Sequence, residues 1–148
     1  MIQRHQIRSV INNDYEQGKT SSILKGLKTI SPQAEAVLIA AVDQPLRERT
    51  INHMIKHMAH TNQAIVTPTY GNQRGHPVLF SASLKGELLR ISEQTHGLKN
   101  IIRTHHELIS ELHTDDAYVL YNFNRPSDYL RVRTHNIPQH NERKGGYE

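Results

Sequence analysis

An apolar run that ends on an acid, an amide and a proline is the stretch of this sequence best suited to chemistry. Residues 36–46 read AVLIAAVDQPL. The run predicts a strand over 36–42 that is buried on both faces, as in a parallel sheet covered by helices. Asp43 would then emerge at the carboxyl end of the strand, where open α/β sheets bind their ligands. Its carboxylate could ligate Mg2+ together with phosphate oxygens, or it could simply end the strand or cap the next helix.

A second group of small and polar residues could bind an anion. Gly18-Lys19-Thr20 is similar to the end of a phosphate-binding P-loop, but Asn13 stands where that motif needs its first glycine. Gly18 still allows close approach of the backbone to a ligand, and the helix expected from residue 20 or 21 offers free amides and the Ser22 hydroxyl. The alternative is a glycine turn followed by an ordinary helix cap.

A third group, Arg74-Gly75-His76-Pro77, combines a fixed cation, a glycine and a titratable imidazole. Placed on the far side of a hairpin, it could hold an anionic, heteroaromatic substrate. The alternative is a plain hairpin turn.

The elements that must position these residues alternate between strand and helix patterns. Helices are expected over 20–30, 45–60, 83–91 and 97–105 and from residue 126, and strands over 7–11, 36–42, 64–70, 76–80, 108–112 and 118–123. This alternation favours an α/β fold, a three-layer sandwich with a mostly parallel sheet.

Composition limits the class of protein. The chain has 148 residues, enough for one domain with a modest core, because only 36% are hydrophobic and the mean hydropathy is −0.64. The absence of cysteine removes disulfides and favours a cytoplasmic location, and we expect neither a membrane span nor a signal peptide. Residues 1–130 are expected to form the domain, and 131–148 a basic, disordered tail. Because this tail offers no stacking platform, nucleic acid is not an expected partner.

The order of several segments resembles the MobA-like nucleotidyltransferases, and within them most closely the molybdenum cofactor cytidylyltransferases. The segments are NNDYEQG (12–18), SS (21–22), DQPL (43–46), IVTPTYGNQRGHPVLF (65–80) and FNRPSDY (123–129). The resemblance runs from about Val10 to Tyr129. It implies a fold like that of nucleotide-diphospho-sugar transferases, and transfer of a nucleoside monophosphate from an NTP onto a phosphate of molybdopterin with Mg2+.

The resemblance also implies a role for individual residues. Asp43 would be the Mg2+ ligand and the catalytic residue, set between the attacking phosphate and the α-phosphate of the NTP. Asn12, Gly18 and Ser22 would lie along the nucleotide. The acceptor pocket would be lined by Arg74, Gly75 and His76. CTP is the expected NTP, with GTP or another NTP left open.

Two departures from the family pattern lead to further expectations. A glycine-rich segment of the type LAAGxSxRxGxxK, with its strand, is absent, and the late acidic element DIDTPEDY reads NFNRPSDY over 122–129. The chain by itself is therefore expected to be inactive. The strand ending at Asp43 would lack a neighbour, which predicts a homo-oligomer or a separately encoded N-terminal partner. The alternatives are a noncatalytic binding or regulatory module that keeps only the acceptor pocket, and a decayed gene product.

Overall fold

The structure is a computed structural model that describes residues 8–134. Its α-helices are α1 (Lys19–Leu27), α2 (Glu48–Thr61), α3 (Lys85–Leu88), α4 (Leu98–Thr104) and α5 (Pro126–Thr134). Its strands are β1 (Ala36–Ile39), β2 (Ile65–Tyr70), β3 (Gln73–Arg74), β4 (Val78–Ser81) and β5 (Ile109–His113). Short 3-10 turns are η1 (Tyr15–Gln17), η2 (Ala82–Leu84), η3 (His106–Leu108) and η4 (Ala117–Leu120).

The strands form one mixed sheet. Its order is β1-β4-β2-β3, and β5 also pairs with β2. β4 is antiparallel to both β1 and β2, and β5 is parallel to β2, so β1, β2 and β5 share one direction. The carboxyl ends of these three strands therefore lie at the same end of the sheet.

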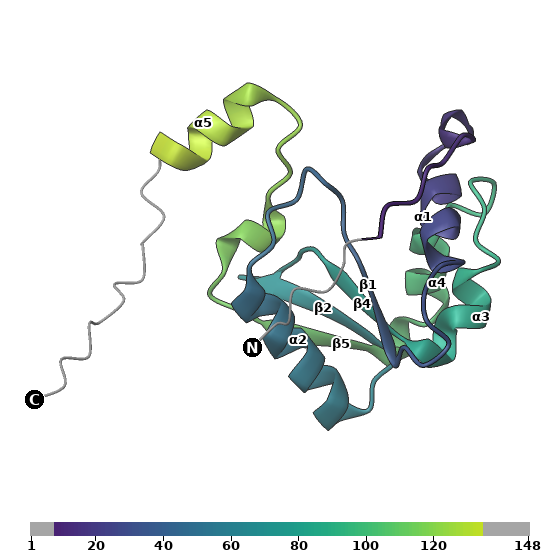
Figure 1. The fold of residues 1–148 in the computed structure, drawn as a ribbon. Helices are drawn as coiled ribbons and strands as arrows, with labels where there is room; N and C mark the ends of the chain where they lie inside the picture. Colours follow the sequence, from purple (N-terminus) through teal and green to yellow (C-terminus); the bar gives the residue numbers. More distant parts are fainter. Residues whose placement is uncertain (1–7, 135–148) are drawn as a thin grey trace, which may run out of the picture.

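Helices cover both faces of the sheet, which confirms the expected α/β sandwich (Figure 1). The sheet is mixed and not mostly parallel as expected, because β4 runs opposite to both its neighbours and β3 turns back on β2, so three of the four pairings are antiparallel. Neighbouring residues of a strand point to opposite faces. On β4, Phe80 therefore packs on the side of α1, α3 and α4, where Leu27, Leu88 and Ile101 are buried with it. Leu79 packs on the other side against Met54 of α2. These two clusters form the hydrophobic core, one on each face of the sheet.

Two expected strands are wrong. The described residues 8–11 are not in a strand, and segment 118–123 begins with the 3-10 turn η4 instead of an extended strand. The cause in the second case is local, because the Asp116 side chain accepts a hydrogen bond from the Tyr118 N–H and so starts a tight turn. The strand expected over 36–42 is present but ends at Ile39.

Two further findings concern the C-terminal end of the domain and membrane-spanning helices. Helix α5 runs to Thr134, past the domain boundary expected at residue 130, and residues 135–148 of the expected tail lie outside the described residues. No helix in the described part of the chain is both long and apolar enough to cross a membrane.

The outer edge of β1 has no partner strand among the described residues, since β1 pairs with β4 alone. The Ala82 N–H donates to the Glu35 carbonyl across the inner edge, at 2.8 Å. Because hydrogen-bonding groups alternate between the two edges of a strand, Ala36 and Leu38 direct their N–H and C=O groups outward. This leaves an open edge beside the candidate site.

Candidate functional site

A tight turn after β1 carries Asp43. The Gln44 N–H donates to the Ala41 carbonyl, and the Gln44 side-chain oxygen accepts from the Ala41 N–H, both at 3.1 Å. Asp43 lies half-buried inside this turn and takes part in no ion pair between described residues. Its carboxylate is therefore available to a ligand.

A distant segment packs onto the same turn. The Phe123 N–H donates to the Asp43 carbonyl at 2.7 Å, and the Gln44 amide donates to the Asn122 side-chain oxygen at 3.0 Å. The segment NFNRPSDY thus contributes the amide oxygen of Asn122, 78 residues after Gln44, next to the turn of Asp43. The sequence placed this element in the site only through the family resemblance.

His76 shares the electrostatic surroundings of Asp43. Its backbone N–H donates to the Val119 carbonyl at 2.7 Å, which fixes the chain where it turns into β4. Although His76 as a residue is exposed, partial burial of its ring lowers its pKa, the positive charge of Lys19 lowers it further, and the negative charge of Asp43 raises it. Lys19 and His76 line one cavity together with Gln44, the residue that follows Asp43.

Arg74 lies apart from this group. Its Nε donates to Glu111 Oε1 of β5 at 2.6 Å, and both side chains are largely in contact with solvent. Gly75 packs so closely on the backbone of Val119 that a Cβ would collide with the Val119 carbonyl oxygen. Of the three residues assigned to the acceptor pocket, only His76 lines the cavity that lies between α1, α4 and the end of β1, which Lys19 also lines.

The residues expected along the nucleotide meet at the start of α1. Asn12 donates from one amide nitrogen to both Ser21 Oγ and Ser22 Oγ, at 2.9 Å each. Gly18 has φ of +101°, a conformation that L side chains rarely adopt, and it precedes the first helical residue. These contacts fix the path of the chain into α1.

The first turn of α1 already holds an anion from the chain itself. The Thr20 N–H donates to Glu93 Oε1 at 2.6 Å, and this hydrogen bond lowers the pKa of the Glu93 carboxyl group. A Cβ on Gly18 would lie 2.7 Å from the same oxygen. The start of α1, where the sequence predicted bound phosphate, is therefore closed by Glu93.

A cavity of about 380 Å³ lies beside these groups, between α1, α4 and the end of β1. Its apolar wall is formed by side chains of all three elements and of β4. The residues of this wall are Ile23, Ile39, Ala40, Ala41, Val78, Leu98 and Ile102. Polar groups at its border come from Lys19, Gln44, His76, Glu93, His96 and Lys99. Sequence reasoning missed the roles of Lys99, Glu93 and Gln44 here, because no local pattern marks them.

The donor set fits a cation held mainly by substrate oxygens. Among residues 8–134, no three histidine, aspartate or glutamate side chains gather as a metal cluster. Asp43 supplies one carboxylate, and neighbouring Asn122 brings an amide oxygen. Mg2+ is commonly bound by one or two carboxylates plus phosphate oxygens and water, so this set is sufficient only with a phosphorylated ligand present.

Solved structures similar to this chain come from mycobacteria. Rv0371c from Mycobacterium tuberculosis H37Rv is 24% identical with a TM-score of 0.63, over 76% of this chain and 58% of that one. Its manganese complex gives 27% identity and a TM-score of 0.59, over 75% and 58%. The Rv0371c homolog from Mycobacterium sp. strain JC1 gives 24% and 0.60, over 75% and 55%. The chain thus spans little more than half the length of these proteins.

Comparisons of the sequence with curated proteins and with protein-family models add to this likeness in fold. A comparison with curated proteins finds no match. The model of the MobA-like NTP transferase domain matches residues 1–109, which is most of the chain. The fold agrees with that match, because the α/β sandwich is shared with the mycobacterial structures. This chain therefore belongs to the MobA-like NTP transferase domain family.

Proposed function

We propose that this domain takes part in Mg2+-dependent transfer of a nucleoside monophosphate from an NTP, with CTP as the expected substrate, to a molybdopterin-like phosphorylated acceptor. The observation that carries the proposal is the half-buried Asp43 carboxylate, without an ion pair to any described residue, beside His76 and a cavity. The manganese complex of Rv0371c, a similar protein, supports a divalent metal in this fold.

The chemistry needs little from the protein beyond positioning. In-line attack of an acceptor phosphate oxygen on the α-phosphate of the NTP forms the new phosphoanhydride bond, while the bond to the β-phosphate breaks and pyrophosphate leaves. This brings negative charges together, and a divalent cation would screen them and hold oxygens of both phosphates. Asp43 would hold that cation, while the turn of Gln44 and the backbone of Phe123 keep the carboxylate in place. His76 is mostly neutral at pH 7 because its pKa is lowered, so it would contribute a hydrogen bond to the acceptor rather than a charge.

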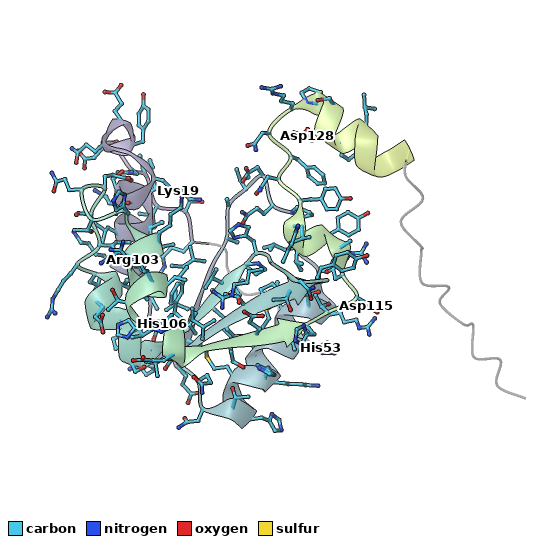
Figure 2. All side chains as sticks on the ribbon, turned by 180° about the vertical axis from the view of Figure 1, so that it is seen from behind. Lys19, His53, Arg103, His106, Asp115 and Asp128 are labelled. Carbon is cyan, nitrogen blue, oxygen red and sulfur yellow. The ribbon has the colours of Figure 1, made fainter. Side chains whose placement is uncertain are left out.

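Metal binding tests the assignment of Asp43. We expect Asp43→Asn to weaken Mn2+ binding, measured by electron paramagnetic resonance in the presence of CTP, by at least about tenfold, because an amide brings no charge. Asp115→Asn is the matched control, since Asp115 is exposed on the opposite side of the molecule from Lys19 (Figure 2). Equal Mn2+ binding by wild type and Asp43→Asn would contradict the proposal.

The proposed function also includes a partner strand that pairs with the outer edge of β1. The outer edge of β1 is open, and a second groove runs along it against α1, lined by Ile23, Leu27, Leu38 and Ile39 among others. Open edges of apolar strands recruit further strands. We propose that a second copy, or a separately encoded N-terminal chain, completes the sheet and that the chain alone is inactive. A cytoplasmic location stays a prediction of the cysteine-free sequence.

A noncatalytic binding module is the second candidate. It is favoured by the amides Asn122 and Asn124, which stand at positions of the family's acidic DIDTPEDY element in the segment that packs on the turn of Asp43. Calorimetry separates the two functions. A nucleotidyltransferase must bind NTP together with Mg2+, whereas a module that keeps only the acceptor site must bind the phosphorylated pterin without either.

A further inference from the structure

The cavity beside Asp43 has an apolar wall and a cationic border. The wall is built from isoleucine, valine, leucine and alanine side chains of α1, β1, β4 and α4. Its border carries Lys19, the first residue of α1, and Lys99, the second residue of α4. Figure 2 shows Lys19 on the side of α1 that faces the sheet. Two exposed lysines from elements far apart in sequence thus line one cavity.

Neither ammonium group is neutralised by the protein. Lys19 and Lys99 form no ion pair with any residue between 8 and 134. The one carboxylate that lines the cavity, Glu93, is already engaged by the Thr20 N–H at 2.6 Å. The two ammonium groups outnumber this one carboxylate, so the border keeps a net positive charge next to an apolar surface.

We propose that Lys19 and Lys99 bind the phosphate groups of a nucleotide whose base lies against the apolar wall of this cavity. The inference rests on the proposed function, and it assigns the phosphate-binding cations that the sequence did not reveal. An anionic ligand with a flat, weakly polar ring matches such a wall and border. Ammonium groups bind phosphate as point charges and need no special geometry.

The cavity also brings Lys19 to the turn that carries Asp43. Lys19 and Gln44, the residue that follows Asp43, both line it. A phosphate held by Lys19 would therefore lie near that turn, as nucleotidyl transfer with a cation held by Asp43 requires.

Calorimetry with inorganic pyrophosphate and Mg2+ tests the pair directly, because pyrophosphate contains no base. We expect Lys19→Met and Lys99→Met each to weaken pyrophosphate binding by about tenfold, the effect of losing one charged hydrogen bond. Lys19→Arg should restore most of the affinity. Lys28→Met is the matched control, since Lys28 follows α1 but does not line the cavity. Thermal melting checks that all variants stay folded.

The outcomes separate this inference from the proposed function. Absence of pyrophosphate binding by the wild-type chain, or unchanged binding by both methionine variants, would overturn the assignment of the lysines. Lysine-dependent binding of pyrophosphate, combined with no transfer from CTP even in a completed sheet, would support the phosphate site and refute the enzyme.

Discussion

Glu93 joins two parts of the chain at the scale of a single residue. Its carboxylate accepts a hydrogen bond from the Thr20 N–H, at the positive end of α1. A loop residue thereby stabilises the first turn of α1, where Thr20 lies 73 positions earlier in the chain. Because α1 forms one wall of the cavity, the contact also sets the position of Lys19.

The pH dependence of this contact gives a prediction. The hydrogen bond lowers the pKa of Glu93 in the folded protein, so its stabilising effect is complete above the usual glutamate pKa and is lost as the pH falls through the lower folded value. We expect Glu93→Gln to have a lower melting temperature than wild type at pH 7. That difference should shrink below about pH 4.

Thermal melts monitored by circular dichroism across this pH range check the prediction. Glu107→Gln is the control, because Glu107 is exposed and belongs to another part of the surface. A melting-temperature difference that stays constant down to pH 3 would mean that the Glu93 charge is irrelevant to α1.

At the scale of elements, Asp116 connects the start of α2 to the turn η4. It is 8% exposed and accepts hydrogen bonds from Thr50 Oγ1 at 2.6 Å and from the Tyr118 N–H at 3.1 Å. Arg47 lies 3.5 Å from the same carboxylate, and its guanidinium group lies over the Tyr118 ring. The η4 turn in turn holds Gly75 and His76 through Val119, so this carboxylate supports the site from outside.

We expect Asp116→Ala to lower the free energy of unfolding by about 2–4 kcal/mol, because it leaves buried donors without an acceptor. Asp115→Ala, next in sequence, should change it by less than about 0.5 kcal/mol, since the Asp115 side chain is 65% exposed and its pair with Arg49 is long, at 3.8 Å. Urea denaturation measures both. Equal urea midpoints for the two variants would show that Asp116 contributes no more to stability than Asp115 does.

A helix or strand could be predicted from the sequence where the residues that fix its conformation lie close together in the chain. The continuous apolar run at 36–42 predicted β1, and the helical spacing of Ile51, Met54, Ile55 and Met58 predicted α2, because each pattern lies within a short window of sequence. Segment 118–123 reads YVLYNF, a short run of aromatic and aliphatic residues typical of a strand. Its conformation is set instead by the Asp116 cap and by the bond from Phe123 to Asp43, contacts that no short window contains.

The same reasoning applies to the site. The position of Asp43 after an apolar strand could be predicted from the sequence, since its cause lies in neighbouring residues. The pairing of Arg74 with Glu111, 37 positions away, could not, and it removes Arg74 from the group that the local motif had suggested. The cavity itself arises from the packing of α1 and α4 beside an open strand edge, a property of the tertiary structure.

For the whole molecule, the decisive feature is the open edge of β1. Figure 1 shows β1 at the margin of the sheet next to β4, with α1 beyond it. Ala36 and Leu38 direct their hydrogen-bonding groups outward, and the groove against α1 is apolar. Such an edge favours addition of another strand, because its outward backbone groups have no partner strand within residues 8–134 and its side chains are mostly only half-buried.

We therefore expect the isolated chain to self-associate as its concentration rises, measured by sedimentation velocity. Ala36→Pro should weaken association by about tenfold or more, because proline removes an outward N–H group and leaves the bonds to β4 intact. Ala36→Val keeps that N–H group and should associate like wild type. A wild-type chain that stays a compact monomer at every concentration would contradict self-association at this edge. Association unaffected by Ala36→Pro would instead place the contact on another surface.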